Sequence, residues 1–295
     1  MKVLILGGSG MLGYAVRSYL DQKGRYYDLV WTERKAERIS YPSDIPENIR
    51  IFDCADCTTQ AGIFDLKMLL ADVNPDYVIN CIGIIKPRMA DNMERAIFIN
   101  ALFPHILARL CKEQQSKLIH ITTDCVFSGL TEQFGVDWRG YTEKSLHDCL
   151  DEYGKSKSLG EPQTNTMVLR TSIIGPEIYN KHSLISWVQR QTNRTIQGYV
   201  NHLWNGVTTF ELAYILNVIM QENTWHAGIK HVFSPEYVTK YILVNLLAQH
   251  YHIPCTIVVA AAPVPCDRRL ATINMDILCN SRIRTIQEQI LSLPE

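Results

Sequence analysis

Two absences in the sequence narrow the classes of protein that it can encode. No apolar run approaches the roughly 18 residues that a membrane-spanning helix needs, and the apolar start of the chain is interrupted by Gly7, Gly8 and Gly10. We therefore expect neither a secretory signal nor a membrane anchor. Neither sign of charge is in excess, because the chain contains 29 basic and 30 acidic residues. Nucleic acid and anionic membrane surfaces are accordingly not expected as partners.

The cysteines lack a recognisable pattern. There are nine, an odd number, and they are scattered without a disulfide framework. Cys54 and Cys57 form one C-x-x-C pair, but no second pair and no pair of histidines follows at the spacing of a zinc site. We interpret the pair as incidental cysteines beside a strand and expect the protein to be cytoplasmic, where thiols stay reduced.

What the N-terminal stretch does contain is a strand, a glycine turn and a helix in succession. Lys2–Leu6 is a continuous apolar run, typical of a strand buried on both faces of a parallel sheet. GGSGMLG follows at 7–13, and apolar residues then recur at helical spacing up to Gly24, where we expect the helix to end. A dinucleotide-binding fingerprint requires this context, because the glycines let the backbone approach a pyrophosphate at the helix N-terminus. A chance glycine loop is the weaker alternative.

A second strand, Asp28–Thr32, ends where an acid would ordinarily bind the ribose hydroxyls of NAD. Thr32 occupies that place and is followed by Glu33, Arg34 and Lys35. A neutral residue followed by cations accommodates the 2′-phosphate of NADP better than an acid would, so we favour NADPH as the cofactor. Glu33 leaves NADH open, and a solvated charged turn is compatible with both.

Further apolar runs predict the other strands of a parallel sheet: Arg50–Asp53, Asp76–Ile82, Leu118–Thr122 and Met167–Ile174. In open parallel sheets the ligand crevice lies off the carboxyl ends of the strands. Asp53, Gly83 and Thr123 lie at such ends, and we expect Asp53 to meet the adenine. The sequence thus predicts an α/β protein with a Rossmann-type, doubly wound parallel sheet.

Beyond Gly175 the alternation of strands and helices loosens. Helices are expected at Ser183–Gln191, Phe210–Gln221 and Lys240–His250, with a strand at His231–Phe233. We interpret this part as a smaller, interleaved C-terminal lobe that closes over the substrate. The expected division gives residues 1–175 and 204–233 to a dinucleotide-binding Rossmann domain, and residues 176–203 and 234–295 to a substrate-binding lobe.

Tyr153 and Lys157 lie four residues apart in a predicted helix, so their side chains share one face. A phenol titrates near about 10, and an ammonium close by favours the phenolate and lowers that pKa. Such a pair can exchange a proton with an oxygen held against it. The same spacing occurs by chance on solvated helix faces, and the pattern gains its weight from the glycine turn that precedes it.

Six segments carry a family resemblance: GGSGMLG at 7–13, NPDYVINCIG at 74–83, HITTDCVFSG at 120–129, YGKSKSLGE at 153–161, LRTS at 169–172 and GVTTFELA at 206–213. With them the chain resembles an extended short-chain dehydrogenase/reductase, most of all the dTDP-4-dehydrorhamnose reductase group. The resemblance implies Thr123, Tyr153 and Lys157 as the catalytic residues. In these roles Thr123 bonds a sugar ketone, Tyr153 protonates the alkoxide and Lys157 bonds the nicotinamide ribose.

The resemblance also implies which residues bind each ligand. Cofactor contacts are expected from the glycine turn, the strand ends and the catalytic pair: Gly7, Gly10, Met11, Leu12, Thr32, Arg34, Asp53, Cys81, Ile82, Gly83, Tyr153 and Lys157. A nucleotide-sugar substrate is expected to meet Ile84, Lys86, Asp124, Cys125, Ile173 and Arg268. The Arg268 guanidinium suits the diphosphate, although solvated surface positions fit both Arg268 and Lys86.

Four departures from the family pattern lie near the expected sugar. Cys125 replaces a Tyr, Ile173 replaces a Trp, Thr208 replaces a Pro, and residues 84–87 replace a Thr-bearing loop. We therefore expect a sugar other than the rhamnose precursor. The glutamates of a metal-bridged dimer seen in some members have no clear match, so no metal is expected, and a homodimer stays open.

These observations predict a reductase of the 4-keto group of a nucleotide-activated deoxyhexose, in deoxysugar or bacterial-type surface polysaccharide biosynthesis. The first alternative is an epimerase or epimerase-reductase that uses Cys125 as acid and base. The second is a non-catalytic redox sensor, but such proteins often lose the Tyr or the Lys that this chain keeps. A 4,6-dehydratase is disfavoured, because the Glu that it needs directly after Asp124 is Cys125.

Overall fold

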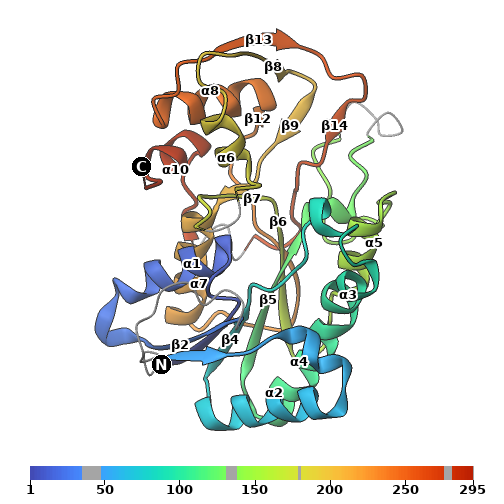
Figure 1. Cartoon of the computed structure of the whole chain (residues 1–295), viewed down its shortest axis with the longest axis vertical. Helices are drawn as coiled ribbons and strands as arrows, with labels where there is room; N and C mark the ends of the chain where they lie inside the picture. The colour runs from blue at the N-terminus through green and yellow to red at the C-terminus, as the bar shows by residue number, and fades with distance from the viewer. Residues whose placement is uncertain (35–47, 131–137, 179–180, 276–280, 295) are drawn as a thin grey trace.

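The computed structural model describes residues 1–34, 48–130, 138–178, 181–275 and 281–294, and Lys35 lies outside them. Its central sheet has seven parallel strands in the order β11-β6-β5-β4-β1-β2-β3 (Figure 1). The strands are β1 (Lys2–Leu6), β2 (Asp28–Glu33), β3 (Ile49–Ile51), β4 (Tyr77–Asn80), β5 (Lys117–Thr123), β6 (Thr166–Thr171) and β11 (Gly228–His231). This order confirms the predicted Rossmann-type sheet.

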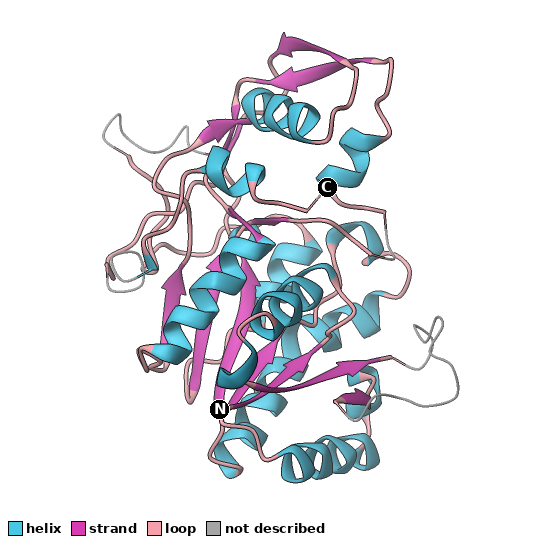
Figure 2. Ribbon diagram, turned by 90° about the vertical axis from the view of Figure 1, so that its left-hand side faces the viewer, coloured by secondary structure: helices cyan, strands magenta, loops and turns pink. Residues whose placement is uncertain are grey.

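Helices cover both faces of the sheet: they flank its strands on two sides in Figure 1, and in Figure 2 the strands are spread out behind a layer of helices. Alternate residues of β1 explain why, since Val3 and Ile5 enter one apolar cluster, and Leu4 and Leu6 the other. The first cluster packs under α1 (Met11–Asp21) and α7 (Thr209–Gln221). The second packs under α2 (Gln60–Val73) and α4 (Phe103–Glu113), with α3 (Met93–Ile97) and α5 (Glu152–Leu159) beside them.

A smaller lobe lies beyond the carboxyl ends of the strands, at the top of Figure 1. It combines short strands with helices around a third apolar cluster. Its elements are β8 (Thr195–Tyr199), β9 (His202–Trp204), β12 (Val238–Thr239), β13 (Thr256–Ala260), β14 (Cys266–Asp267), α6 (Leu184–Gln189), α8 (Lys240–His250) and α10 (Ile286–Leu291). Short helical turns elsewhere are η1 (Gly24–Tyr26), η3 (Cys54–Thr58), η4 (Lys86–Arg88), η5 (Phe98–Leu102) and η6 (Asp124–Val126).

Several element ends differ from the sequence prediction, and the strands expected at Arg50–Asp53 and Asp76–Ile82 already end at Ile51 and Asn80. The run Met167–Ile174 forms two strands, because the chain leaves the sheet after β6 and continues as β7 (Ile173–Ile174), which pairs with β10 (Val207–Thr208). The strand expected at His231–Phe233 instead ends at His231. Helix α1 ends at Asp21 with Gln22 as its C-cap, and Gly24 lies beyond it in η1.

Candidate active site

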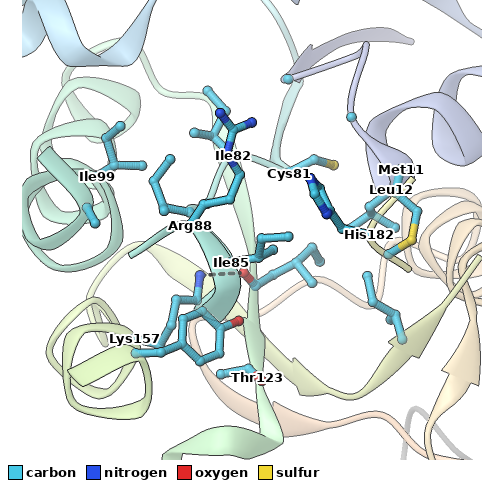
Figure 3. A pocket seen from close by; sticks show the side chains of 18 of the residues that line it. Met11, Leu12, Cys81, Ile82, Ile85, Arg88, Ile99, Thr123, Lys157 and His182 are labelled. Atoms are coloured by element: carbon cyan, nitrogen blue, oxygen red, sulfur yellow. Dashed lines mark hydrogen bonds between the residues drawn. The ribbon is translucent and has the colours of Figure 1, made fainter. Parts of the chain in front are cut away.

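One elongated cavity of about 560 Å³ lies off the carboxyl ends of the central strands. It extends from the glycine turn between β1 and α1 to the start of α5. Its lining also includes residues 171–174, Glu177 and residues 182–184, of which His182 is labelled in Figure 3. Of the described residues that the sequence assigned to a ligand, Lys86 and Arg268 alone lie outside its lining. The structure therefore brings the expected cofactor residues and the three expected catalytic residues to one site.

The glycine turn has the geometry that a pyrophosphate requires. Gly7 has a φ of +82°, and a Cβ built on it would lie 3.0 Å from the Ile82 side chain, so only glycine is free of strain there. Helix α1 begins after Gly10 without a side-chain cap, and Met11 and Leu12 of its first turn line the cavity. The positive end of the helix dipole therefore faces the cavity, which fits the phosphates of a dinucleotide.

Thr32 fixes the turn from the neighbouring strand, because its Oγ1 accepts a hydrogen bond of 2.9 Å from the Gly7 amide. The side chain is buried at the edge of the cavity, and the ribose contact that the sequence suggested stays a prediction. Glu33 and Arg34 follow and also line the cavity. Two charges of opposite sign thus lie next to each other in the lining of the cavity.

Helix α5 carries the Tyr153 and Lys157 pair, and its N-terminus is fixed by two contacts. Asp151 caps the helix, with Oδ1 accepting from the Gly154 amide at 2.8 Å, and its Oδ2 pairs with Lys86 Nζ at 2.9 Å. A Cβ on Gly154 would lie 2.3 Å from the Cys125 carbonyl oxygen, so the helix approaches η6 as closely as glycine alone allows. Lys86, which the sequence predicts to meet the substrate, bonds the cap of this helix in the structure.

Burial sets the protonation of the catalytic pair. Lys157 is 5% exposed, its Nζ donates to the Ile121 carbonyl at 3.5 Å, and burial lowers its pKa to about 8. Burial also raises the pKa of Tyr153 above its usual value, with the nearby Cys125 adding to this and a hydrogen bond to Thr123 opposing it. The pKa of Tyr153 is therefore raised overall, and the expected lowering by Lys157 is wrong in its net direction. The phenol stays protonated at neutral pH, which suits a proton donor.

Asn100 is a buried residue beside the site whose contacts the sequence did not predict. It is 1% exposed, and its amide oxygen accepts from the Ile84 amide at 2.8 Å. Its Nδ2 donates to the Ile84 carbonyl at 2.9 Å and to Ser156 Oγ at 3.1 Å. One amide thus ties the loop after β4 to helix α5. A polar residue within the apolar run 98–103 is the sequence signal that could have revealed it.

At the substrate end, Cys125 lies between an acid and a cation. Its Sγ is 3.6 Å from Asp124 Oδ1 and 3.9 Å from an Arg268 Nη1. Burial, reinforced by the Asp124 charge, raises the pKa of Cys125 to about 12 despite Arg268, and burial raises the pKa of Asp124 as well. The thiol is therefore neutral at physiological pH. Arg268 also donates through Nε to the Phe127 carbonyl at 2.8 Å, which fixes it beside the cavity.

The opposite end of the cavity contains an ion pair that no local pattern indicated. Asp53 caps η3, accepting from the Ala55 amide at 3.0 Å, and both its oxygens bind Arg95 Nη2 at 2.9 and 3.1 Å. Arg88 of η4 and His182, which precedes α6, line the cavity from opposite sides (Figure 3). Asp53, which was expected to contact the adenine, thus lines the cavity while its carboxylate is already paired with Arg95.

The described residues offer neither a membrane span nor a cluster of metal ligands. None of the helices there combines the length and apolar character needed to cross a bilayer. In the same part of the chain, no three His, Cys, Asp or Glu side chains gather as a set of metal ligands.

Comparison with known proteins shows what this arrangement is similar to. Residues 1–271 match the family described as the RmlD substrate binding domain. A probable low-salt glycan biosynthesis reductase of Haloferax volcanii is 30% identical over 183 residues, 59% of this chain and 54% of that protein, so the chain spans about half of that relative. A dTDP-4-dehydrorhamnose reductase of Aggregatibacter actinomycetemcomitans is 25% identical, over 81% of this chain and 76% of its own length. The structure of a Bacillus anthracis dTDP-4-dehydrorhamnose reductase in complex with NADP has the same fold, with a TM-score of 0.73 and 17% identity over 99% of this chain and 98% of that one.

Proposed function

The chain belongs to the RmlD substrate binding domain family, and from this premise we propose that it is a nicotinamide-dependent reductase of a sugar nucleotide. The substrate that we propose is a deoxyhexose with a 4-keto group, activated by dTDP, UDP or GDP. One observation carries the proposal: a single cavity joins a dinucleotide-binding turn to Thr123, Tyr153 and Lys157. The direct test is substrate-dependent oxidation of the reduced cofactor by the purified chain. A panel of 4-keto-6-deoxy sugar nucleotides that elicits no oxidation would refute it.

Each catalytic residue has a role in ketone reduction. A bound reduced nicotinamide supplies the hydride. The Thr123 hydroxyl, which donates to Asp124 Oδ1 at 3.2 Å in this structure, would turn to donate to the ketone oxygen. Tyr153 gives its proton to the oxygen as negative charge develops there. Lys157, protonated below about pH 8, would bond the ribose and hold the cofactor in line with Tyr153.

NADPH is the cofactor that we propose. If Arg34 meets the 2′-phosphate, NADPH should bind at least about tenfold more tightly than NADH, or by about 1.4 kcal/mol. Replacing Arg34 by Ala should remove most of this difference while leaving NADH affinity nearly unchanged. Fluorescence titration of both dinucleotides measures it, with Arg190→Ala in the lobe as a matched control. Equal affinities in the unmodified chain would show that Arg34 does not select the cofactor.

The structure supplies one observation for the epimerase-reductase alternative, the Arg268 cation beside Cys125. A base on the far face of the sugar needs a thiolate, however, and burial raises the pKa of Cys125 to about 12. We therefore propose that Cys125 fills space beside the sugar and that simple reduction takes place.

Turnover in D2O separates the two chemistries. We expect the product of a simple reduction to contain no deuterium at C3 or C5 beyond non-enzymatic exchange, because no base removes a proton there. NMR of the product sugar provides the measurement, and Cys125→Ser provides the control. Deuterium at either carbon that disappears in Cys125→Ser would contradict simple reduction.

We also propose the division of labour within the chain that the sequence suggested. Residues 1–175 and 204–233 bind the dinucleotide, and residues 176–203 and 234–295 bind the substrate. Most residues of the lobe's apolar cluster belong to the second pair of ranges, which supports this division, although Ile174, Trp204 and Phe210 join it from the first. The place of β11 at the edge of the central sheet supports it as well.

A further inference from the structure

Glu33 poses a problem for an NADPH site. It ends β2, in the region where a dinucleotide fold places the ribose of the adenosine, and it lines the cavity. A free carboxylate at this place repels a 2′-phosphate and bonds the two hydroxyls of NADH instead. Glu33 is nevertheless only 4% exposed, so what surrounds its carboxylate determines its effect on the cofactor.

Two side chains hold the carboxylate on the face of the sheet that α1 covers. Trp31 and Glu33 point to the same side of β2, because side chains alternate along a strand. Trp31 Nε1 donates to Glu33 Oε1 at 3.0 Å. Arg17 of α1 places Nη1 3.8 Å from the same oxygen, and its guanidinium carbon lies 5.0 Å from the centre of the Trp31 ring.

The Arg17 pair differs from an ordinary surface ion pair. The Arg17 side chain is 17% exposed and that of Glu33 is 3% exposed, so water and salt screen the pair less than they would at the surface. The stacking of Arg17 on Trp31 further restricts the guanidinium. A positive charge is thereby held close to the Glu33 carboxylate, which would oppose a 2′-phosphate.

We propose that Arg17 and Trp31 determine the preference for NADPH by neutralising Glu33 and turning it away from the ribose. The inference rests on the proposed function and assigns Arg17 as a positioning residue, which acts on the cofactor through Glu33. Without the guanidinium, the carboxylate either repels the 2′-phosphate or rotates to the ribose hydroxyls. Both outcomes lower the affinity for NADPH relative to NADH.

The role of Arg17 can be tested with a cycle of variants of the full chain. For each variant, fluorescence titration measures the affinities for NADPH and for NADH. Arg17→Met should lower the ratio of the two affinities by about tenfold or more. Adding Glu33→Gln to Arg17→Met should restore the ratio to within about threefold of the unmodified chain, and Arg17→Lys should preserve it. Lys23→Met is the matched control, because it removes a positive charge that lies over Tyr19 at 4.8 Å beyond the end of α1.

An unchanged ratio in Arg17→Met overturns the inference, and so does a lowered ratio that Glu33→Gln fails to restore. Should Arg17→Met not fold, as judged by its thermal transition, Trp31→Phe keeps an aromatic ring beside Arg17 and removes the indole N–H donor. That variant should lower the ratio by about threefold, and an unchanged ratio would again overturn the inference. If the unmodified chain binds neither NADPH nor NADH, the proposed function itself is refuted. The variants test only the effect of Arg17, Trp31 and Glu33 on the ratio of the two affinities.

Discussion

Replacing Tyr153 by Phe is expected to lower turnover by about a hundredfold or more, because the variant keeps the ring and loses the proton that the alkoxide needs. Cofactor affinity should remain nearly unchanged, since the phenol hydroxyl acts at the substrate end of the cavity. Steady-state kinetics with a 4-keto sugar nucleotide, together with titration of NADPH, measure the two effects separately.

The matched control for this variant is Tyr214→Phe, which removes a phenol from α7 on the other side of the sheet. Its turnover should equal that of the unmodified chain. If Tyr153→Phe retained turnover near that of the unmodified chain, another group would have to supply the proton, and the catalytic assignment would be wrong.

Breaking the buried ion pair between Glu161 and Arg170 should have the largest effect on stability. The two side chains are 3% and 2% exposed, and Arg170 donates three bonds of 2.6 to 3.1 Å to the carboxylate. Arg170→Met leaves that carboxylate buried without its partner. Such a change costs about 3 to 5 kcal/mol of unfolding free energy, which urea denaturation followed by circular dichroism measures.

Two controls test the cause of this loss. Arg170→Met combined with Glu161→Gln removes both charges, and should recover much of the stability because no charge stays buried without a partner. Lys67→Met breaks the exposed pair with Glu113, whose side chains are 57% and 48% exposed, and should change stability by less than about 1 kcal/mol. A small effect of Arg170→Met would mean that water or His147, whose Nε2 lies 3.7 Å from Glu161 Oε2, stabilises the carboxylate in place of Arg170.

The parts of the structure that the sequence predicted correctly are those that a local pattern of residues defines. The buried run of β1 and the glycine turn identified the Rossmann-type sheet. The four-residue spacing of Tyr153 and Lys157 placed both on α5, as observed. Because parallel strands end at one edge, the sequence also placed Gly83 and Thr123 in one cavity.

The remaining features depend on contacts between distant parts of the chain, which periodicity does not encode. Asp53 and Arg95 pair across 42 residues, and Asn100 and Ser156 across 56. The break between β6 and β7 depends on β10, which follows more than thirty residues later. The direction of the Tyr153 pKa depends on burial, which spacing along a helix does not reveal.

The position of β11 has a consequence for synthesis on the ribosome. The first six strands of the sheet lie within residues 1–171, so a nascent chain can assemble most of the dinucleotide site before the lobe has emerged. Helix α7 and β11 come only at residues 209–231. Until then the apolar residues that α7 covers, Leu12 and Val16 of α1 among them, stay open to solvent. We expect a nascent chain at this stage to be the form that chaperones bind.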